Sequence, residues 1–167
     1  MPSQPPRPAL TTLLARLAAS GADFVLVGGL AAVAQGAPLT TLDVDVVHRR
    51  GDDNAQRLLD FLAAVDAHYR GRPPGQVLRP TRELLLGEGH HLLSTTLGPL
   101  DVLGAIEGGR DYESLLPETV TLEVEGQRVR VVRLRTLADL KRGATSQKDR
   151  LVLAILEDTI RASGRET

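Results

Sequence analysis

The chain has 167 residues with 20 basic and 21 acidic side chains, and its formal charge of −1 provides no strong field toward nucleic acid or anionic lipid. It contains no cysteine, which excludes disulfides and thiolate metal sites, and a chain of this length can bury a core without such cross-links. Aromatic residues make up 2% of the chain, too few for the base-stacking platforms of single-strand-binding proteins.

The first eight residues contain four prolines and no apolar periodicity. We expect residues 1–8 to be disordered and residues 9–167 to form one domain. The opening residues match neither a signal peptide nor a transit peptide, and the longest uncharged run, 24–42, is interrupted by glycine, proline and threonine. We therefore expect a cytoplasmic protein that does not contact a membrane.

Helix and strand patterns alternate along the first half of the chain. Leucines at helical spacing indicate an amphipathic helix, and an apolar run that ends at a glycine pair indicates a buried strand entering a tight turn. Small residues after that turn suit a helix packed closely on the strand. The expected elements are a helix over 10–17, a strand over 24–27, a helix over 30–35, a strand over 43–47, and a helix that Asp53 or Asn54 caps and that ends near His68.

Two hairpins and three helical segments are expected in the second half. In chain order they are a hairpin of 92–97 with 100–103, a helical turn over 112–116, a hairpin of 119–124 with 129–132, a helix from Thr136 through Lys141, and a closing helix over 149–162. The whole order predicts a mixed α/β or α+β domain.

Two aspartates on the expected strand 43–47 carry the clearest chemical signal. Side chains two apart on a strand share one face, so Asp43 and Asp45 point the same way while Val44 and Val46 face the core. The two carboxylates repel each other, and a divalent cation bound by their oxygens offsets that repulsion. Two solvated aspartates on a half-exposed strand are the structural alternative.

A glycine pair, Gly28 and Gly29, separates the expected strand 24–27 from the helix after it. Such a turn brings backbone N–H groups and the positive end of a helix to one point, where a phosphate can bind. A tight turn that needs glycine for its backbone is the simpler explanation. Together with the aspartates, the pair supplies an anion cradle and metal ligands, which phosphoryl transfer requires.

The order of these features resembles a known family. Gly28-Gly29, a helix, Gly36, Thr41 and Asp43-Val44-Asp45 together look like the minimal nucleotidyltransferases of the DNA polymerase β superfamily, in their toxin-like subgroup of abortive-infection and toxin–antitoxin enzymes. That family carries a third carboxylate on a neighbouring strand, which Asp101 matches, and then a helix with a Lys and a Lys-Asp at the start of the next helix, which Lys141, Lys148 and Asp149 match. The resemblance covers residues 24–160. It implies an α+β fold of the polymerase-β-like nucleotidyltransferase kind, with a central mixed β-sheet flanked by helices and with C-terminal helices.

The resemblance also implies a role for each matched residue. Asp43, Asp45 and Asp101 would be the catalytic carboxylates and would bind two Mg²⁺ ions, with Mn²⁺ as the alternative metal. Backbone approach at the glycines and a compact Lys charge would hold the triphosphate. The implied nucleotide-binding residues are Gly28, Gly29, Thr41, Lys141 and Asp149.

The chain departs from the family pattern at two cations. Members of the group usually carry an Arg shortly before the Asp pair, where this chain has Leu39, and often an Arg in the Lys-to-Asp segment, where it has Ser146. Arg142 and Arg49 are the candidate replacements. Without a replacement, nucleotide affinity would be weak, so a degenerate, non-catalytic binding or regulatory module is the alternative function.

The function that the resemblance implies is transfer of a nucleoside monophosphate from an NTP to an acceptor. The acceptor would be an RNA 3′ end, such as that of tRNA, or a protein hydroxyl, and the protein would be the toxin component of a toxin–antitoxin or phage-defence system with a cognate antitoxin. A small-molecule transferase of the antibiotic-modifying kind is a third hypothesis. An acceptor phosphate backbone would bind five arginines in the segments 48–54 and 69–80: Arg49, Arg50, Arg70, Arg72 and Arg79.

Three further features have weaker signals. His90 and His91 are adjacent on an expected strand, so they face opposite ways and cannot easily share a metal. His48 follows the Asp pair and is expected in an exposed loop, where it could contact a phosphate. The segment 128–150 has eight basic residues against two acidic ones, which indicates either a solvated face or an anion-binding surface.

Overall fold

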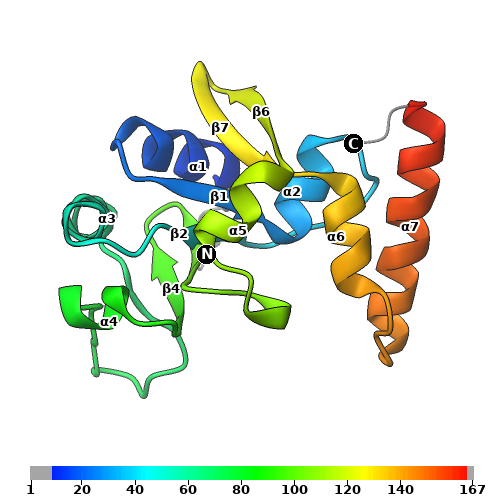
Figure 1. Cartoon of the computed structure of the whole chain (residues 1–167). Coiled ribbons are helices and arrows are strands. Elements are labelled where there is room, and N and C mark those ends of the chain that lie inside the picture. Colours follow the sequence, from blue (N-terminus) through cyan, green and yellow to red (C-terminus); the bar gives the residue numbers. More distant parts are fainter. Residues whose placement is uncertain (1–8, 165–167) are drawn as a thin grey trace, which may run out of the picture.

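The computed structural model describes residues 9–164, so the expectation for residues 1–8 falls outside the described part of the chain. Within it, a mixed seven-stranded sheet has the order β3-β4-β5-β2-β1-β7-β6 (Figure 1). The pairs β2–β5 and β1–β7 are parallel, and the other pairs are antiparallel. The strands are β1 Phe24–Val27, β2 Val44–His48, β3 His68–Tyr69, β4 His90–Thr95, β5 Gly98–Leu103, β6 Thr119–Val124 and β7 Gln127–Val132.

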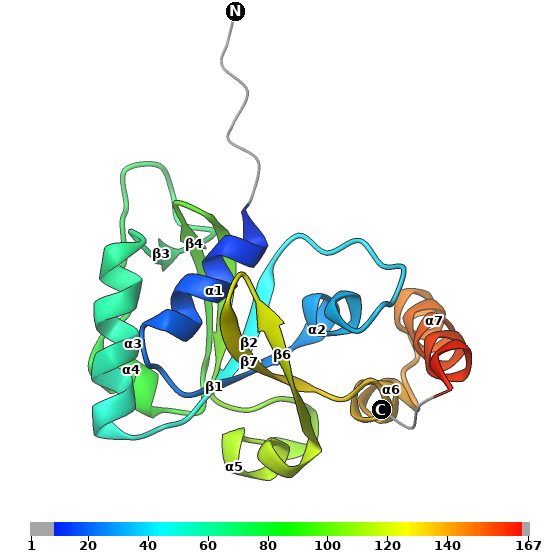
Figure 2. The same ribbon diagram turned by 90° about the horizontal axis from the view of Figure 1, so that it is seen from above.

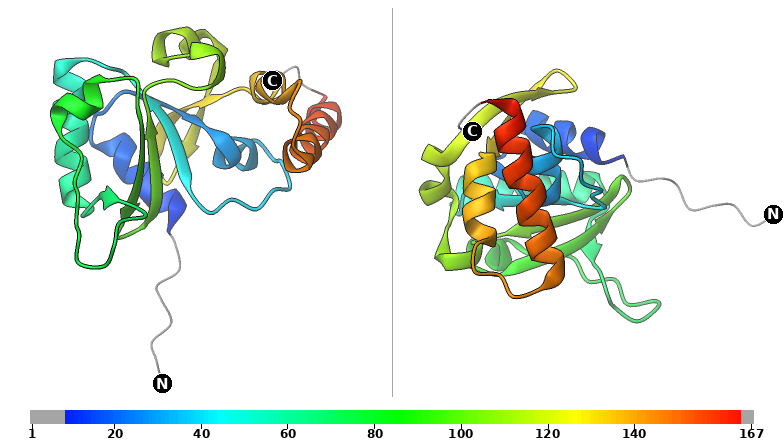
Figure 3. Two further views of the ribbon diagram at one scale, coloured as in Figure 1. Left: turned by 90° about the horizontal axis from the view of Figure 1, so that it is seen from below. Right: turned by 90° about the vertical axis from the view of Figure 1, so that its right-hand side faces the viewer.

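Helices surround this sheet on both sides. In Figure 2, α1 crosses over the strands, and α3 and α4 lie together beside the β3–β4–β5 part of the sheet. Figure 3 shows α6 and α7 side by side at the other end, as a pair of C-terminal helices. The α-helices are α1 Leu10–Ala19, α2 Gly28–Ala34, α3 Asp52–Ala64, α4 Arg82–Leu86, α5 Tyr112–Leu115, α6 Leu134–Lys141 and α7 Gln147–Ser163, with 3-10 turns at Glu107–Gly109 and Leu116–Glu118. This arrangement confirms the predicted α+β fold.

The core lies where α1 and α3 press apolar stripes onto the sheet. The leucines of α1 recur at helical spacing and are buried, and β1 is buried along its whole length. A strand covered on both faces reads as a continuous apolar run, which explains the sequence of β1. β1 and β2 therefore form the centre of the sheet.

The start of α3 differs from the prediction. Gly51 occupies the N-cap, and neither Asp53 nor Asn54 caps the helix. Asn54 is fully buried, and its amide accepts a hydrogen bond from Asp23 N (2.7 Å) and donates to Asp23 O (3.0 Å) and Arg49 O (2.8 Å). The helix ends at Ala64 rather than near His68, because the chain turns at Asp66, where φ is +55°, and His68 begins β3.

The C-terminal helices begin earlier than predicted. Leu134 starts α6 after Arg133, and Thr136 lies inside the helix, where its hydroxyl donates to Glu118 Oε2 (3.2 Å). Gln147 starts α7, and Ser146 caps it by accepting a hydrogen bond from Asp149 N (3.0 Å). The short elements β3 and α4 were not predicted, because neither is long enough to show an apolar period.

Candidate active site

Three aspartates meet where β2 begins beside β5. Asp43 immediately precedes β2, Asp45 lies on β2, and Asp101 lies on β5 as the direct partner of Asp45 in the parallel pairing. Each offers one carboxylate oxygen, and these oxygens lie within 4.8 Å of one another. The structure therefore brings together the three carboxylates that the sequence singled out, and we refer to them as the acidic triad.

Local strand geometry produces this arrangement. Val44 and Val46 are fully buried on one face of β2, so alternation turns Asp45 to the opposite face. On β5, Leu100 and Val102 are fully buried on either side of Asp101. Paired residues of neighbouring strands point to the same side of a sheet, so the register alone places Asp101 beside Asp45.

The electrostatics of the triad favour a bound cation. Burial, and then the charges of Asp43 and Asp101, raise the pKa of Asp45 to about 7. Burial and the charge of Asp101 also raise the pKa of Asp43, against a lowering by Arg70 and Lys148. Asp45 Oδ1 is buried and has no hydrogen-bond partner among the described residues. Three oxygen donors with excess negative charge fit a hard divalent cation such as Mg²⁺.

The glycine pair adjoins the triad. Gly28 has φ +71°, and a Cβ atom there would collide with Asp45 Oδ2. A Cβ at Gly29 would lie 3.1 Å from Thr41 Oγ1, and that hydroxyl donates to Asp43 O (3.2 Å). The pair thus allows the backbone after β1 to approach Asp45 and Thr41 closely.

The start of α7 supplies positive charge near the triad. Lys148 lowers the pKa of Asp43 through its charge. Lys141 on α6 donates to Asp149 Oδ1 (3.1 Å), and that bond, with the cap at Ser146, lowers the pKa of Asp149. Lys141 and Asp149 therefore form an ion pair across the α6–α7 turn.

Arg70 is a site residue that the sequence assigned to a different role. Its guanidinium donates to Asp101 Oδ1 and to Leu93 O, both at 2.6 Å. The sequence placed it among five arginines that would bind an acceptor. Its contact with the triad depends on the pairing of the two-residue strand β3 with β4, for which the sequence has no signal.

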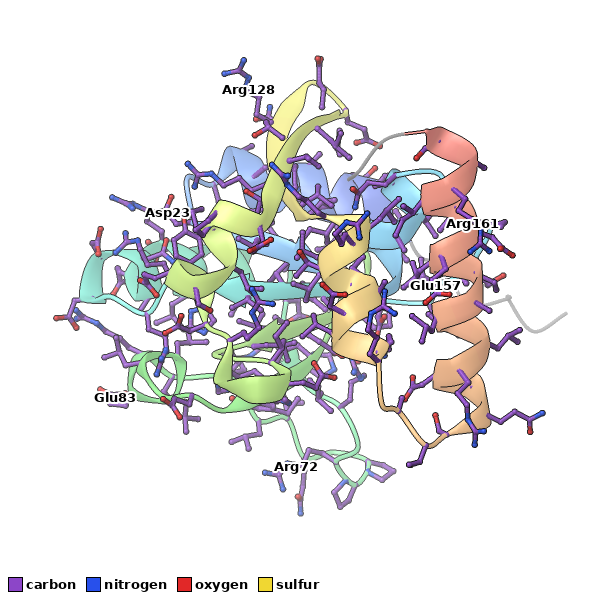
Figure 4. The ribbon with its side chains drawn as sticks, turned by 45° about the vertical axis from the view of Figure 1, so that its right-hand side comes forward. Asp23, Arg72, Glu83, Arg128, Glu157 and Arg161 are labelled. Carbon is purple, nitrogen blue, oxygen red and sulfur yellow. The ribbon has the colours of Figure 1, made fainter. Side chains whose placement is uncertain are left out.

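The other arginines of that predicted cluster lie elsewhere. Arg49 pairs with Asp23 (2.9 Å) and Asp53 (3.0 Å), Arg50 pairs with Glu88 and Asp111, and Arg79 pairs with Asp66. In Figure 4, Arg72 projects outward from the loop after β3. Arg49 and Arg50 follow the far end of β2 from the triad, so the expected common cluster is wrong.

The two candidate replacements for the missing arginines are paired with acids elsewhere. Arg49 is engaged with Asp23 and Asp53, as described above. Arg142 pairs with Asp139 (2.9 Å) and with Glu157 on α7 (3.3 Å). Glu157 is labelled in Figure 4. Neither guanidinium contacts the acidic triad in the described structure.

The basic segment 128–150 does not form one surface. Arg130 donates to Tyr112 Oη (2.8 Å), Lys141 pairs with Asp149, and Arg150 donates to Thr145 O (2.7 Å). Arg128 projects from the β6–β7 hairpin, away from α7 (Figure 4). The segment is thus divided between a hairpin and two helices.

The histidines lie outside the triad. His48 ends β2 and is 1% exposed, so the expectation of a solvent-exposed loop histidine is wrong. His91 on β4 is also buried, and its Nδ1 is 2.7 Å from Tyr69 Oη. His90 turns the other way, with Nε2 2.9 Å from Ala105 O, which agrees with the predicted opposite orientation of the two neighbours.

No helix within residues 9–164 combines the length and the apolarity that crossing a bilayer requires.

Comparisons with known proteins identify the fold. The chain matches no family model and no curated protein sequence. Among solved structures it is similar to a candidate nucleotidyltransferase from Thermotoga maritima, with a TM-score of 0.53 and 15% identity over 93% of this chain and 92% of that one. It is also similar to the lincomycin-bound lincosamide antibiotic adenylyltransferase LnuA, with a TM-score of 0.58 and 10% identity over 89% and 94%. A third similar structure is the antibiotic-resistance factor ANT(2″)-Ia, with a TM-score of 0.54 and 12% identity over 92% and 84%. The chain therefore has the predicted polymerase-β-like nucleotidyltransferase fold.

Proposed function

We propose that this protein is a divalent-metal-dependent nucleotidyltransferase that transfers a nucleoside monophosphate from an NTP to an acceptor hydroxyl. The observation that carries the proposal is the acidic triad, whose oxygens lie within 4.8 Å of one another beside a glycine that clears the space. Asp45 and Asp101 are register partners on β2 and β5, and Asp43 directly precedes β2, so the cluster is built into the sheet.

Mg²⁺ is the proposed cofactor, with two ions held by Asp43, Asp45 and Asp101 and with Mn²⁺ able to replace them. When bound, such ions polarise the reacting phosphate and lower the pKa of the acceptor hydroxyl. The protein's own contribution is to hold the carboxylates on one face of the sheet, where Val44, Val46, Leu100 and Val102 anchor them from the other side. Fixed charges of this kind need little reorganisation during the reaction.

The nucleotide would bind next to the triad. Gly28 and Gly29 let backbone N–H groups approach the phosphates, and Thr41 is the nearest hydroxyl to that turn. Lys141 would neutralise the triphosphate, and Asp149 would hold Lys141 in place through their ion pair. Ser146 caps α7 instead of supplying a cation, so Lys148 and Lys141 are the proposed positive charges on this side.

We propose an RNA 3′ end such as that of tRNA, or a protein hydroxyl, as the acceptor, with the protein acting in the cytoplasm as a toxin that a cognate antitoxin neutralises. The support is the order of motifs shared with the toxin-like subgroup. Similarity to the antibiotic adenylyltransferase LnuA makes a small-molecule acceptor the second candidate. A non-catalytic module is the third, because Arg49 and Arg142, the candidate replacements for the missing arginines, are both paired with acids.

Calorimetry tests the proposal. The protein is titrated with each NTP in Mg²⁺ and in EDTA, beside an Asp45→Asn variant and an Asp139→Asn control, whose aspartate is exposed on α6. We expect metal-dependent binding of at least one NTP by the wild type and the control, and none by Asp45→Asn. Binding of no NTP under any condition would contradict the enzyme and support the non-catalytic module.

Labelled triphosphates then identify the acceptor. The protein is incubated with each labelled NTP and, in separate reactions, with total tRNA, with cell protein and with a small-molecule extract. Label on RNA or protein supports the macromolecular acceptor. Label confined to the small-molecule fraction overturns that part of the proposal and favours the antibiotic-modifying class.

A further inference from the structure

Arg70 is fixed to the sheet by both its backbone and its side chain. Its backbone N–H donates to Leu92 O (2.9 Å), which continues the β3–β4 ladder one residue beyond β3. Its guanidinium reaches across β4, where Nη1 donates to Leu93 O and Nη2 donates to Asp101 Oδ1 on β5. Leu92 is the register partner of Asp101, so Arg70, Leu92 and Asp101 lie in one row across three strands.

The contact is shielded and specific. The Arg70 side chain is 30% exposed and the Asp101 side chain 15% exposed, so this pair is much less solvated than the Arg161–Asp158 pair on α7, whose side chains are 69% and 71% exposed. Because Leu93 O holds one end of the guanidinium, the other end has a fixed position. A planar guanidinium can bond two acceptors at once, which a flexible ammonium group does not reproduce.

The bond from Arg70 also gives the two carboxylate oxygens of Asp101 different roles. Oδ1 accepts from Arg70, which leaves Oδ2 with its lone pairs for a cation. Carboxylates that bind metal ions are commonly oriented by hydrogen bonds from neighbouring groups, and loss of such a group typically lowers metal affinity by about 10- to 100-fold.

We propose that Arg70 is a positioning residue, which holds Asp101 through Oδ1 so that Oδ2 completes a divalent-cation site with Asp43 and Asp45. This inference rests on the proposed function, because it assigns Arg70 a task in the same site. Arg70 acts through Asp101 and has no contact with the reacting atoms in this role.

Charge and orientation act in opposite directions here, and the variant must separate them. The positive charge of Arg70 repels a cation, so removal of that charge alone would tighten metal binding. Arg70→Lys keeps the charge and removes the two-point geometry. A fall in metal affinity in Arg70→Lys therefore reports orientation.

The chain offers a matched control in Arg79. Its guanidinium also joins an aspartate, Asp66 Oδ1 (2.6 Å), to a backbone carbonyl, Ala67 O (3.2 Å). Asp66 is not part of the acidic triad. Arg79→Lys thus makes the same chemical change in the same kind of contact away from the proposed cation.

The experiment measures Mn²⁺ affinity by electron paramagnetic resonance and calorimetry, without nucleotide, for the wild type, Arg70→Lys, Arg79→Lys, Asp101→Asn and the Arg70→Lys/Asp101→Asn double variant. We expect about tenfold weaker binding in Arg70→Lys and wild-type affinity in Arg79→Lys. In the Asp101→Asn background Arg70→Lys should cause no further loss, because the two residues act as one unit. If Arg70→Lys does not fold, Arg70→Gln replaces it. That variant also removes the positive charge, which by itself would tighten metal binding, so weaker Mn²⁺ binding in Arg70→Gln reports lost orientation, and unchanged or tighter binding overturns the positioning role.

The outcomes distinguish this inference from the proposed function. Wild-type or tighter Mn²⁺ binding by Arg70→Lys overturns the positioning role and leaves the nucleotidyltransferase proposal standing. An equal loss in Arg79→Lys also overturns it, because the effect would then not belong to Asp101. Mn²⁺ binding that is absent in the wild type, or equal in the wild type and Asp101→Asn, overturns the proposed function itself.

Discussion

Asp45 and Asp101 are direct partners in the parallel pairing of β2 with β5, so their carboxylates leave the same face of the sheet side by side. Parallel neighbours cannot be connected by a short turn, and 52 residues of helix, strand and loop separate β2 from Asp101 along the chain, counting 49–100. The close pair is therefore a product of the whole fold, and its repulsion is a cost that the folded protein carries.

Metal-free protein should be stabilised by Asp45→Asn. A carboxyl whose pKa is higher in the folded than in the unfolded chain lowers the free energy of unfolding as the pH rises from the unfolded pKa to the folded one. The pKa of Asp45 is raised to about 7, so Asp45 progressively lowers the stability of the fold between about pH 4 and pH 7. We expect Asp45→Asn in EDTA at pH 8 to be more stable by roughly 1–3 kcal/mol, a value reduced for the coupling of the three carboxylates. Thermal unfolding measures it.

Magnesium should reverse that order. Under the proposed function, Mg²⁺ would bind the folded wild type and stabilise it, whereas the variant lacks a ligand and would gain little. A wild-type melting temperature that does not respond to millimolar Mg²⁺ at pH 8 would contradict the metal site.

Gly28→Ala should remove metal binding. The residue has φ +71°, and its Cβ would collide with Asp45 Oδ2, so the carboxylate must move out of the triad. The backbone strain alone costs about 1 kcal/mol or slightly more. Gly75→Ala is the control, since Gly75 has φ +83° and no atom within 4 Å of the added Cβ.

Both variants should therefore carry similar backbone strain, to which Gly28→Ala adds the displacement of the Asp45 carboxylate, and only Gly28→Ala should lose Mn²⁺ affinity. Calorimetry and thermal melts on the same samples give both quantities. Retained Mn²⁺ affinity in Gly28→Ala would show that the close approach of the glycine to Asp45 is not needed for the site.

Much of the site followed from local pattern. Alternation of buried valines with aspartates fixed the direction of Asp45, and the short turn at Gly98 fixed the hairpin that holds Asp101. The glycine pair marked the end of β1 because it directly follows a continuous apolar run. These features depend on neighbours in sequence, which is why they could be predicted.

The remainder depended on contacts between distant segments. Arg70 reaches Asp101 only because β3 pairs with β4, and two residues of strand leave no periodic signal. The sequence made Arg49 a candidate phosphate ligand, but in the fold its guanidinium pairs with Asp23 and Asp53. This chain has many arginines, and the role of each depends on which acidic side chains lie beside it in the fold. The spacing of arginines along the sequence does not reveal those neighbours.

Ser146 has a structural task at the position where the resemblance led us to expect an arginine. Its hydroxyl caps α7 by accepting from Asp149 N, and the same segment carries the Lys141–Asp149 ion pair. Ser146→Ala should cost about 1 kcal/mol in the free energy of unfolding. Ser146→Gly, which caps nearly as well through its exposed backbone, should cost only a few tenths of that, and urea titration compares the two. Equal losses would contradict a capping role.

Buried His48 should make the protein sensitive to mild acid. Burial, with the nearby His91 and Arg50 charges, lowers the pKa of His48 to about 4, and both ring nitrogens lack a hydrogen-bond partner among the described residues. Between about pH 6.5 and pH 4, His48 is protonated in the unfolded chain and neutral in the folded chain. The free energy of unfolding therefore falls as the pH drops through this range, by at most roughly 3 kcal/mol. Burial also lowers the pKa of His91, which adds a loss of the same sign.

His48→Leu tests this directly, because it keeps a side chain of moderate size and removes both the titration and the unpartnered nitrogens. We expect the variant to gain more stability over the wild type at pH 5 than at pH 7.5, as measured by urea unfolding at both values. The acidic triad changes stability with the opposite sign over part of this range, so the comparison is made in the Asp45→Asn background. A pH-independent difference between His48→Leu and its parent would show that His48 does not titrate between the folded and unfolded states in this window.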